Sequence, residues 1–282
     1  MTSLARIVTG PDGAPTLVLL HGITGSAVSL AEAIDHWVGR GYRVVAVDAR
    51  GHGLSPRWTP AQRERAGEVF VEDLIAVLED LATASRGRAA LGLPTPPAPV
   101  VIGHSMGAAT AMVAAGRRPD LVRGLVLVCP FLRGPQSRVK TLVQRTMLGI
   151  ALMRPWGPAV WNSYSARLWP GLPDARQRAT RLGDLLRRPG RWRAFWATTR
   201  TDHRVVSPWL VKVNCPALVV MGKEDPDWKE PAAEAAWVAS AVGGGGGEVV
   251  IVPGAGHAPM LERPGLVGPQ VVDFARHVIA GN

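Results

Sequence analysis

The chain has 282 residues, of which 47% are hydrophobic and 19% charged, and its formal net charge is +10. This length suits one large α/β domain or two small ones, and the composition excludes a disordered chain. Residues 1–15 lack the continuous apolar stretch of a signal peptide and no run elsewhere is long enough to span a bilayer, so we expect a cytoplasmic protein with no membrane span.

Short apolar runs rich in β-branched residues recur along the chain and predict buried strands. Helical patterns with a period near 3.6 separate them. This alternation predicts an α/β fold with a mostly parallel central sheet and helices on both faces, which binds ligands at the carboxyl ends of its strands. The predicted strands are 16–20, 42–47, 100–102, 124–129, 216–222 and 248–252.

The helices between these strands differ in character. An amphipathic stretch ends near Gly39, and a second helix runs from about Glu68 to the Gly- and Pro-rich segment 86–99, which we expect to be a loop. An Ala-rich helix begins at Met106. The closing helix places four apolar side chains on one stripe, namely Val267, Val271, Phe274 and Val278.

Residues 131–213 interrupt the alternation. They contain at least two helical segments, 138–153 and 174–188, and six of the ten tryptophans. We therefore expect 131–213 to form a helical lid inserted into a core made of residues 1–130 and 214–282.

The positive charge is concentrated in this same segment, which holds 14 Arg and 2 Lys against three Asp. The rest of the chain has a small excess of acidic residues, so a general nucleic-acid-binding protein is the wrong expectation. A membrane role for the basic segment is the alternative, and solvated arginines are the simpler interpretation. Cys129 and Cys215 fall at opposite ends of predicted neighbouring strands, too far apart for a disulfide, which fits a reducing compartment.

One short motif points to chemistry. In VVIGHSMGAA (100–109) a serine follows a strand and precedes a helix, with glycines two positions away on each side. A tight strand-to-helix turn strains its apex and leaves no room for side chains at Gly103 and Gly107. Ser105 at the apex would then stand free as a nucleophile, and the amide N–H of Met106 would point at the atom that it attacks.

The other candidate residues also follow predicted strand ends. HGITGS follows 16–20, KEDPDW follows 216–222 and PGAGHAP follows 248–252, so that serine, acid and histidine occur in this order. With DARGHGLS, GHSMG, GKED and GHAPMLERP as further signatures, the sequence resembles the α/β-hydrolase superfamily over nearly its whole length.

The resemblance implies a Ser-His-Asp triad. A serine hydroxyl needs a base, and His257 is the histidine that lies in a Gly-rich loop between the last strand and a helix. Asp225 stands where the family's G-x-x-D places the acid that orients this histidine. Asp227 and Glu224 are the competing acids.

The resemblance also implies an oxyanion hole formed by the backbone N–H groups of Ile23 and Met106. Asp48, Arg50 and His52 of DARGHGLS are expected to fix a loop beside the site rather than to react. The sequence has neither the spacing of a zinc site nor a dinucleotide motif, so we expect a reaction without metal or cofactor.

The family's fold supports several reactions, so the fold does not choose among them. We expect hydrolysis of a carboxylic ester of a small, largely apolar molecule through an acyl-enzyme. The alternatives are a thioesterase or acyltransferase acting on a chain held by an acidic carrier protein, carbon–carbon bond hydrolysis, and a non-catalytic receptor. Serine as nucleophile argues against the aspartate-dependent branches of the family. Substrate choice is expected to lie with tryptophans of the lid, namely Trp156, Trp161, Trp192 and Trp196.

Overall fold

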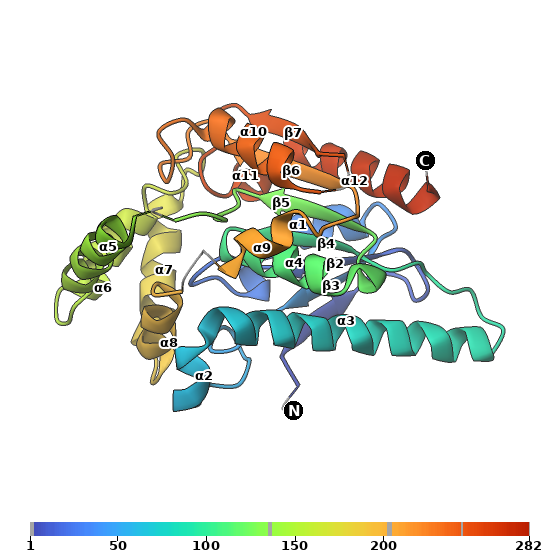
Figure 1. Ribbon diagram of the computed structural model, residues 1–282, viewed down its shortest axis with the longest axis horizontal. Coiled ribbons are helices and arrows are strands. Elements are labelled where there is room, and N and C mark those ends of the chain that lie inside the picture. The colour runs from blue at the N-terminus through green and yellow to red at the C-terminus, as the bar shows by residue number, and fades with distance from the viewer. Residues whose placement is uncertain (1–2, 135–136, 202–204, 244, 282) are drawn as a thin grey trace.

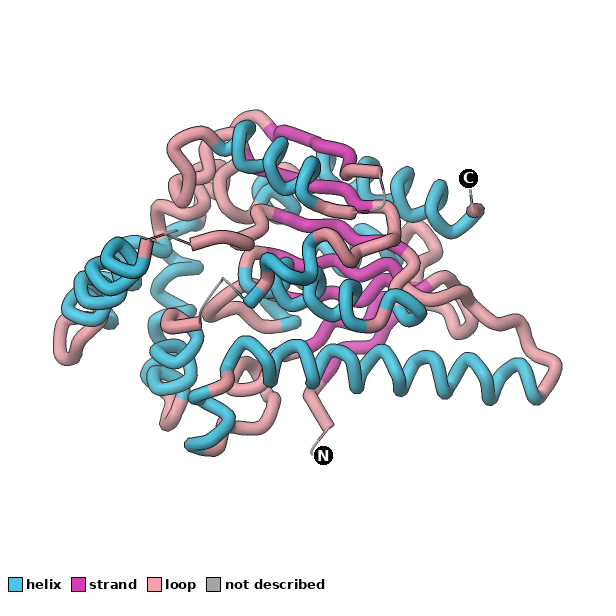
Figure 2. The backbone as a smooth tube through the Cα atoms, in the orientation of Figure 1, coloured by secondary structure: helices cyan, strands magenta, loops and turns pink. Residues whose placement is uncertain are grey.

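A seven-stranded sheet with the order β1-β3-β2-β4-β5-β6-β7 forms the centre of the computed structural model (Figure 2). The structure describes residues 3–134, 137–201, 205–243 and 245–281, so Asp202, His203 and Gly244 lie outside it. The strands are β1 (Arg6–Thr9), β2 (Thr16–Leu20), β3 (Arg43–Val47), β4 (Val100–His104), β5 (Gly124–Val128), β6 (Ala217–Gly222) and β7 (Gly247–Val252).

All six predicted strands are confirmed, and they pair in parallel. Every residue of β2, β4 and β5 is buried, as expected of strands covered on both faces. β1 was not predicted. It pairs antiparallel with β3 at the edge of the sheet, from Arg6 opposite Val47 to Thr9 opposite Val44. Ile7 and Val8 of this strand are exposed and its other two residues are partly buried, so the strand does not need the longer apolar run of the other strands.

Helices cover both faces of the sheet (Figure 1). α1 (Ala31–Val38) packs with α12 (Pro264–Ala280) on one face, and α3 (Ala66–Ala90), α4 (Met106–Arg117) and α10 (Pro231–Ala241) lie on the other. The predicted apolar stripe of the closing helix is confirmed, since all four of its side chains are buried.

The segment 86–99 is not wholly a loop, which corrects the expected end of the second helix. α3 continues to Ala90 because Gly87 is surrounded by good helix formers and its position is open to solvent. The helix stops before Gly92, which has a φ of +69°.

Between β5 and β6 the chain forms a group of helices that stands to one side of the sheet (Figure 1). We call residues 137–201 the insertion. It contains α5 (Arg138–Ala151), α6 (Gly157–Ser165), α7 (Ala175–Arg187) and α8 (Arg191–Thr198). These helices share a hydrophobic cluster separate from the main core, made of Leu152, Trp161, Leu186, Trp192 and Phe195.

The chain returns to the sheet through α9 (Ser207–Leu210), which packs on α4. Val206, Leu210 and Val213 belong to the main hydrophobic core rather than to the cluster of the insertion. The remaining helices are short, namely α2 (Pro60–Glu64), α11 (Pro259–Glu262) and the 3-10 helices η1 (Ala27–Leu30) and η2 (Pro119–Leu121). Within the described ranges, no helix has both the length and the apolar character needed to cross a membrane.

The strand order changes direction at β2, which makes a topological switch point there. β2 continues to β3 on one side, whereas the next strand, β4, lies on the other side of β2. The loops after β2 and β4 therefore diverge from a shared crevice at the carboxyl ends of these strands. These loops carry Ile23 and Ser105.

Candidate active site

Ser105 lies at the sharp turn between β4 and α4 that the sequence predicts. Its backbone has a φ of 53° and a ψ of −113°, a conformation that strains any residue with a side chain. A Cβ on Gly103 would lie 2.5 Å from the Gly107 carbonyl oxygen, and one on Gly107 would lie 2.8 Å from the His21 carbonyl oxygen. The glycines are therefore required because the helix backbone crosses directly over the end of the strand.

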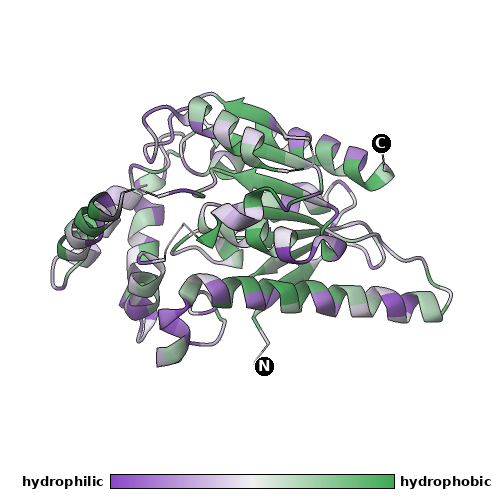
Figure 3. Cartoon of the chain, in the orientation of Figure 1, coloured by the Kyte–Doolittle hydropathy of each residue, from purple (hydrophilic) through white to green (hydrophobic). Residues whose placement is uncertain are grey.

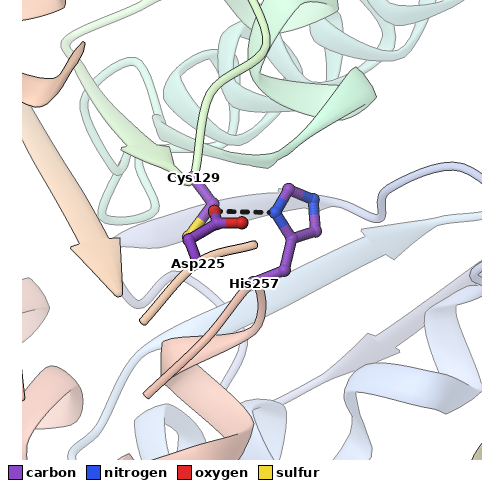
Figure 4. A group of neighbouring side chains, drawn as sticks. All are labelled: Cys129, Asp225 and His257. Atoms are coloured by element: carbon purple, nitrogen blue, oxygen red, sulfur yellow. Dashed lines mark hydrogen bonds and ion pairs between the residues drawn. The ribbon is translucent and has the colours of Figure 1, made fainter. Parts of the chain in front are cut away.

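His257 and Asp225 are in direct contact. The Nδ1 of His257 lies 2.8 Å from the Oδ2 of Asp225, and both side chains are almost fully buried (Figure 4). Asp227 approaches the same nitrogen at 3.3 Å. The other oxygen of Asp225 accepts the backbone N–H of Asp227 at 3.0 Å, which fixes the carboxylate. This arrangement makes Nδ1 a donor and leaves Nε2 of the imidazole as the basic nitrogen.

The electrostatics favour the charged forms of both groups. Burial lowers the pKa of His257, but the hydrogen bond and charge of Asp225, together with the charges of Asp227 and Glu262, outweigh burial and raise it above 6.5. Burial raises the pKa of Asp225, and the hydrogen bond and charge of His257 outweigh burial and lower it. The pair therefore favours an imidazolium beside a carboxylate, which is what a general base needs after it accepts a proton.

The loop after β2 lies against Ser105. A Cβ on Gly22 would lie 3.2 Å from the Ser105 Cβ. The backbone N–H groups of Ile23 and Met106 donate no hydrogen bond to any described residue. Met106 is also the first residue of α4, where the helix dipole is positive. Two free donors and a helix N-terminus thus border the serine.

His104 links the serine turn to the histidine loop. Its Nε2 donates a 2.6 Å hydrogen bond to the His257 carbonyl oxygen. Burial is the main cause that lowers the pKa of His104 to about 3, so the ring is a neutral donor. The Ser105 hydroxyl makes no hydrogen bond with a described residue. The structure thus brings Asp225 and His257 into contact, and His104 joins the Ser105 turn to the His257 loop.

Glu262 is a buried carboxylate that sequence analysis did not single out. Its Oε2 accepts the N–H groups of Gly256 at 2.9 Å and Gly171 at 2.8 Å, and its Oε1 accepts that of Ala258 at 3.0 Å. These bonds hold the residues on both sides of His257. The signal for this role was present in GHAPMLERP, because an acid five residues after the histidine is close enough to cap its own loop.

Tyr164 and Cys129 were also missed. The Tyr164 hydroxyl on α6 donates to Asp227, so the insertion reaches the acid beside His257. Cys129 follows β5 and has a positive φ of 42°. The Cys129 sulfur lies within 4.8 Å of ligand atoms of Asp225 and His257. The contacts of Tyr164 and Cys129 both join segments far apart in the chain, so no local sequence pattern predicts them.

Cys129, Asp225 and His257 place three potential metal-binding atoms within 4.8 Å of one another (Figure 4). The chemistry of these donors does not fit a metal. Burial raises the pKa of the Cys129 thiol well above its usual value, so the thiolate that a metal needs is disfavoured. The imidazole nitrogen of the group is already bonded to the carboxylate.

The residues of DARGHGLS hold a loop, as predicted. Asp48 accepts the N–H groups of Ala27 and Leu54, each at 2.7 Å. Arg50 forms a buried two-point ion pair with Asp73, with N···O distances of 2.6 and 2.8 Å. Both free cysteines are confirmed in the described structure.

The predicted tryptophans occupy three different environments. Trp161 is buried in the insertion, with its ring centroid 4.6 Å from that of Phe195. Trp156 is 45% exposed on the surface. Trp192 and Trp196 line a cavity of about 990 Å³ between the start of α3 and the helices α5 and α8.

This cavity is rich in arginine. It is also lined by apolar residues such as Leu152 and Met153, whereas Ser105, Asp225 and His257 are not among its walls. Ile23 packs against the cluster of the insertion, so the insertion touches the loop that borders Ser105. The arginines of the cavity are Arg63, Arg65, Arg145, Arg154, Arg193 and Arg200.

Curated relatives match only part of this chain. The mouse sn-1-specific diacylglycerol lipase ABHD11 is 38% identical over 126 residues, which is 44% of this chain and 35% of the lipase. Epoxide hydrolase B of Mycobacterium tuberculosis is 34% identical over 118 residues, 42% of this chain and 29% of that enzyme. The chain thus spans about a third of the length of these relatives.

The whole fold has counterparts among solved structures. The esterase EaEST from Exiguobacterium antarcticum superimposes with a TM-score of 0.77 at 16% identity, covering 97% of this chain and 95% of the esterase. A likeness at this identity shows the fold. The family model described as "Serine aminopeptidase, S33" matches residues 12–264, nearly the whole chain. With its mostly parallel sheet and the strained serine turn after β4, the chain belongs to this family of α/β-hydrolases.

Proposed function

We propose that the protein hydrolyses a carboxylic ester of a small, largely apolar molecule through an acyl-enzyme on Ser105. One observation carries the proposal, namely the contact between the His257 Nδ1 and the buried Asp225 carboxylate at the strand ends where the Ser105 turn also lies. Family membership supports a hydrolase. The similarity to a diacylglycerol lipase over part of the chain supports an ester as the substrate.

In the first half of the reaction, the Ser105 Oγ attacks the ester carbonyl carbon and its proton passes to the Nε2 of His257. The negative charge moves to the carbonyl oxygen, where the N–H groups of Ile23 and Met106 stabilise it. Asp225 keeps the imidazole in the tautomer with its proton on Nδ1. His257 then gives the proton to the leaving alkoxide, and an alcohol departs.

In the second half, water attacks the acyl-enzyme. His257 accepts a proton from this water and returns it to Ser105 as the carboxylic acid leaves. These steps use the ester, one water molecule and groups of the chain itself. The side chains of Ile23 and Met106 take no part, because the stabilisation comes from their backbone donors.

Labelling with a fluorophosphonate, read by mass spectrometry, tests the nucleophile. We expect modification of Ser105 alone and loss of ester turnover in Ser105→Ala, with an unchanged unfolding temperature. Full turnover in the alanine variant would refute the proposal. A folded, unlabelled protein that binds a small molecule without turnover would instead identify a receptor.

The arginine-rich cavity favours a second candidate, cleavage or transfer of an acyl chain presented by an acidic carrier protein. Arginines and tryptophans line the same wall, with Arg154 5.9 Å from the Trp192 ring and Arg200 5.6 Å from the Trp196 ring. Glu64 and Glu68 also line the cavity, but the arginines outnumber them, and a basic surface with aromatic rings suits an anionic group beside an apolar chain. Adding alcohols or thiols as acceptors during turnover separates the reactions, because a transferase forms new esters or thioesters whereas a hydrolase releases acid.

A further inference from the structure

The helix α5 of the insertion turns an apolar stripe toward solvent. Val139, Leu142, Val143, Met147 and Ile150 recur at helical spacing and are each at least half exposed, with Val139 70% and Leu142 67% exposed. The stripe runs along a helix of 14 residues, which corresponds to about 21 Å. The opposite side of α5 packs inward through Leu148 and Leu152, so the exposed stripe does not support the fold.

α6 extends this apolar surface. Trp156, Val160 and Tyr164 follow one another at intervals of four residues and are between 37% and 45% exposed. The indole N–H of Trp156 donates to the Ile150 carbonyl oxygen at 2.9 Å, which satisfies its polar atom and leaves the ring outside. We call α5 and α6 with these side chains the arm. Figure 3 shows hydrophobic and hydrophilic stretches side by side on α5 and α6 where these helices stand away from the sheet.

The charged residues of the segment 137–173, which contains the arm, are all basic. No Asp or Glu occurs from residue 137 to residue 173, whereas Lys140, Arg154 and Arg167 are exposed there. Among the described residues these three cations have no ion-pair partner. An isolated apolar side chain on a surface is ordinary, but a continuous apolar stripe beside exposed cations indicates a binding surface.

We propose that the arm docks on a lipid bilayer that carries anionic headgroups, with the stripe of α5 in the interface and the cations against phosphates. A helix with an apolar face, a basic border and aromatic residues at its edge has the features of an interfacial helix. The surface is a projecting ridge, which a deformable bilayer accepts. The charge selects anionic lipids, because each cation near such a surface adds attraction.

Sedimentation with vesicles tests the proposal. The full-length protein is mixed with vesicles of phosphatidylcholine alone or with phosphatidylglycerol, and the bound fraction is measured. We expect binding to the mixed vesicles that weakens as salt is added. Leu142→Glu should weaken this binding about tenfold or more, because the leucine no longer enters the apolar region. Lys140→Gln with Arg154→Gln should weaken binding to the mixed vesicles only.

Leu91→Glu is the matched control. Leu91 is 75% exposed at the end of α3, far from the arm in Figure 1, so this variant should bind as the unaltered chain does. The unfolding temperature of each variant checks that it folds. Ser105→Ala should also bind normally, so a failure of the esterase proposal would leave this result unaffected.

Three results would overturn the proposal. The first is no binding of the unaltered chain to either vesicle. The second is an equal loss of binding in Leu91→Glu. The third is a dimer in analytical ultracentrifugation that Leu142→Glu disperses without any vesicle binding, which would show that a second copy of the chain covers the stripe.

Discussion

Asp225 and Asp227 both approach the Nδ1 of His257, yet their surroundings differ. The Asp225 side chain is fully buried and fixed by a backbone N–H, whereas the Asp227 side chain is 16% exposed and bonded to Tyr164. We expect Asp225→Asn to lower kcat by about 10⁴, in line with the corresponding change in serine proteases, because the imidazole loses its tautomer. Asp227→Asn should lower kcat by about tenfold or less, since the shorter bond to Asp225 remains.

Steady-state kinetics with a chromogenic ester, alongside thermal unfolding of each variant, would measure both changes. The opposite ranking would assign the acid of the triad to Asp227 and leave the roles of Ser105 and His257 untouched.

The raised pKa of His257 sets the direction of the pH dependence. Only the neutral imidazole acts as a base, so kcat/KM should rise with pH and reach half its maximum above pH 6.5. Asp227→Asn should move this midpoint downward, because it removes one of the charges that raise the pKa. A pH series for both proteins measures the midpoints. A midpoint below pH 6.5 in the unaltered chain would contradict this assignment of the base.

At the scale of residues, the sequence predicted the site residues that directly follow strands. It did not predict the residues whose contacts join distant parts of the chain. Ser105, Asp225 and His257 each follow an apolar run, so the sequence alone predicts that they lie at the carboxyl ends of strands. The bond from His104 to the His257 carbonyl spans 153 positions, and no spacing rule predicts it. Cys129 beside Asp225 was hidden in the same way, because its position depends on the pairing of β5 with β6.

Among the elements, α3 is tied to the loop after β3 by the Arg50–Asp73 pair. The two side chains are only 6% and 10% exposed, so removal of the carboxylate leaves a buried cation without its partner. We expect Asp73→Asn to lower the free energy of unfolding by about 3–5 kcal/mol. Asp80→Asn is the matched control on the same helix, since its bond with Arg6 is exposed and should contribute less than about 1 kcal/mol.

Chemical denaturation of the two variants measures this difference. Equal losses would mean that the pair does not hold α3 against the loop.

The elements also show why some boundaries escaped prediction. Strands β2 to β7 were predictable because burial on both faces demands continuous apolar runs. β1 lies at the edge of the sheet, where Arg6–Thr9 is partly exposed, so its sequence does not need a continuous apolar run. In α3 the order of Gly and Pro residues suggested a loop from residue 86, but the helix persists until the left-handed Gly92.

For the whole molecule, the net charge of +10 makes salt a test of substrate class. A neutral ester should show a kcat/KM that changes little with ionic strength, because no charge steers its approach. If the natural substrate is the apolar ester that we propose, a carboxylated ester should gain nothing at low salt. Measurement of both esters at low and high salt distinguishes the cases. A steep fall confined to the carboxylated ester would favour the acidic carrier.

The path of the chain between β5 and β6 determines which insertions and deletions the fold tolerates. Leu210 of α9 and the flanking Val206 and Val213 already belong to the main core, so the return of the chain to the sheet does not depend on α5 to α8. The insertion can therefore be lengthened, shortened or exchanged by recombination at its two ends without a change in strand register. Two contacts of the insertion limit such an exchange, because Tyr164 donates to Asp227 and Gly171 donates to Glu262, so a new insertion must reproduce both contacts to keep the His257 loop in place.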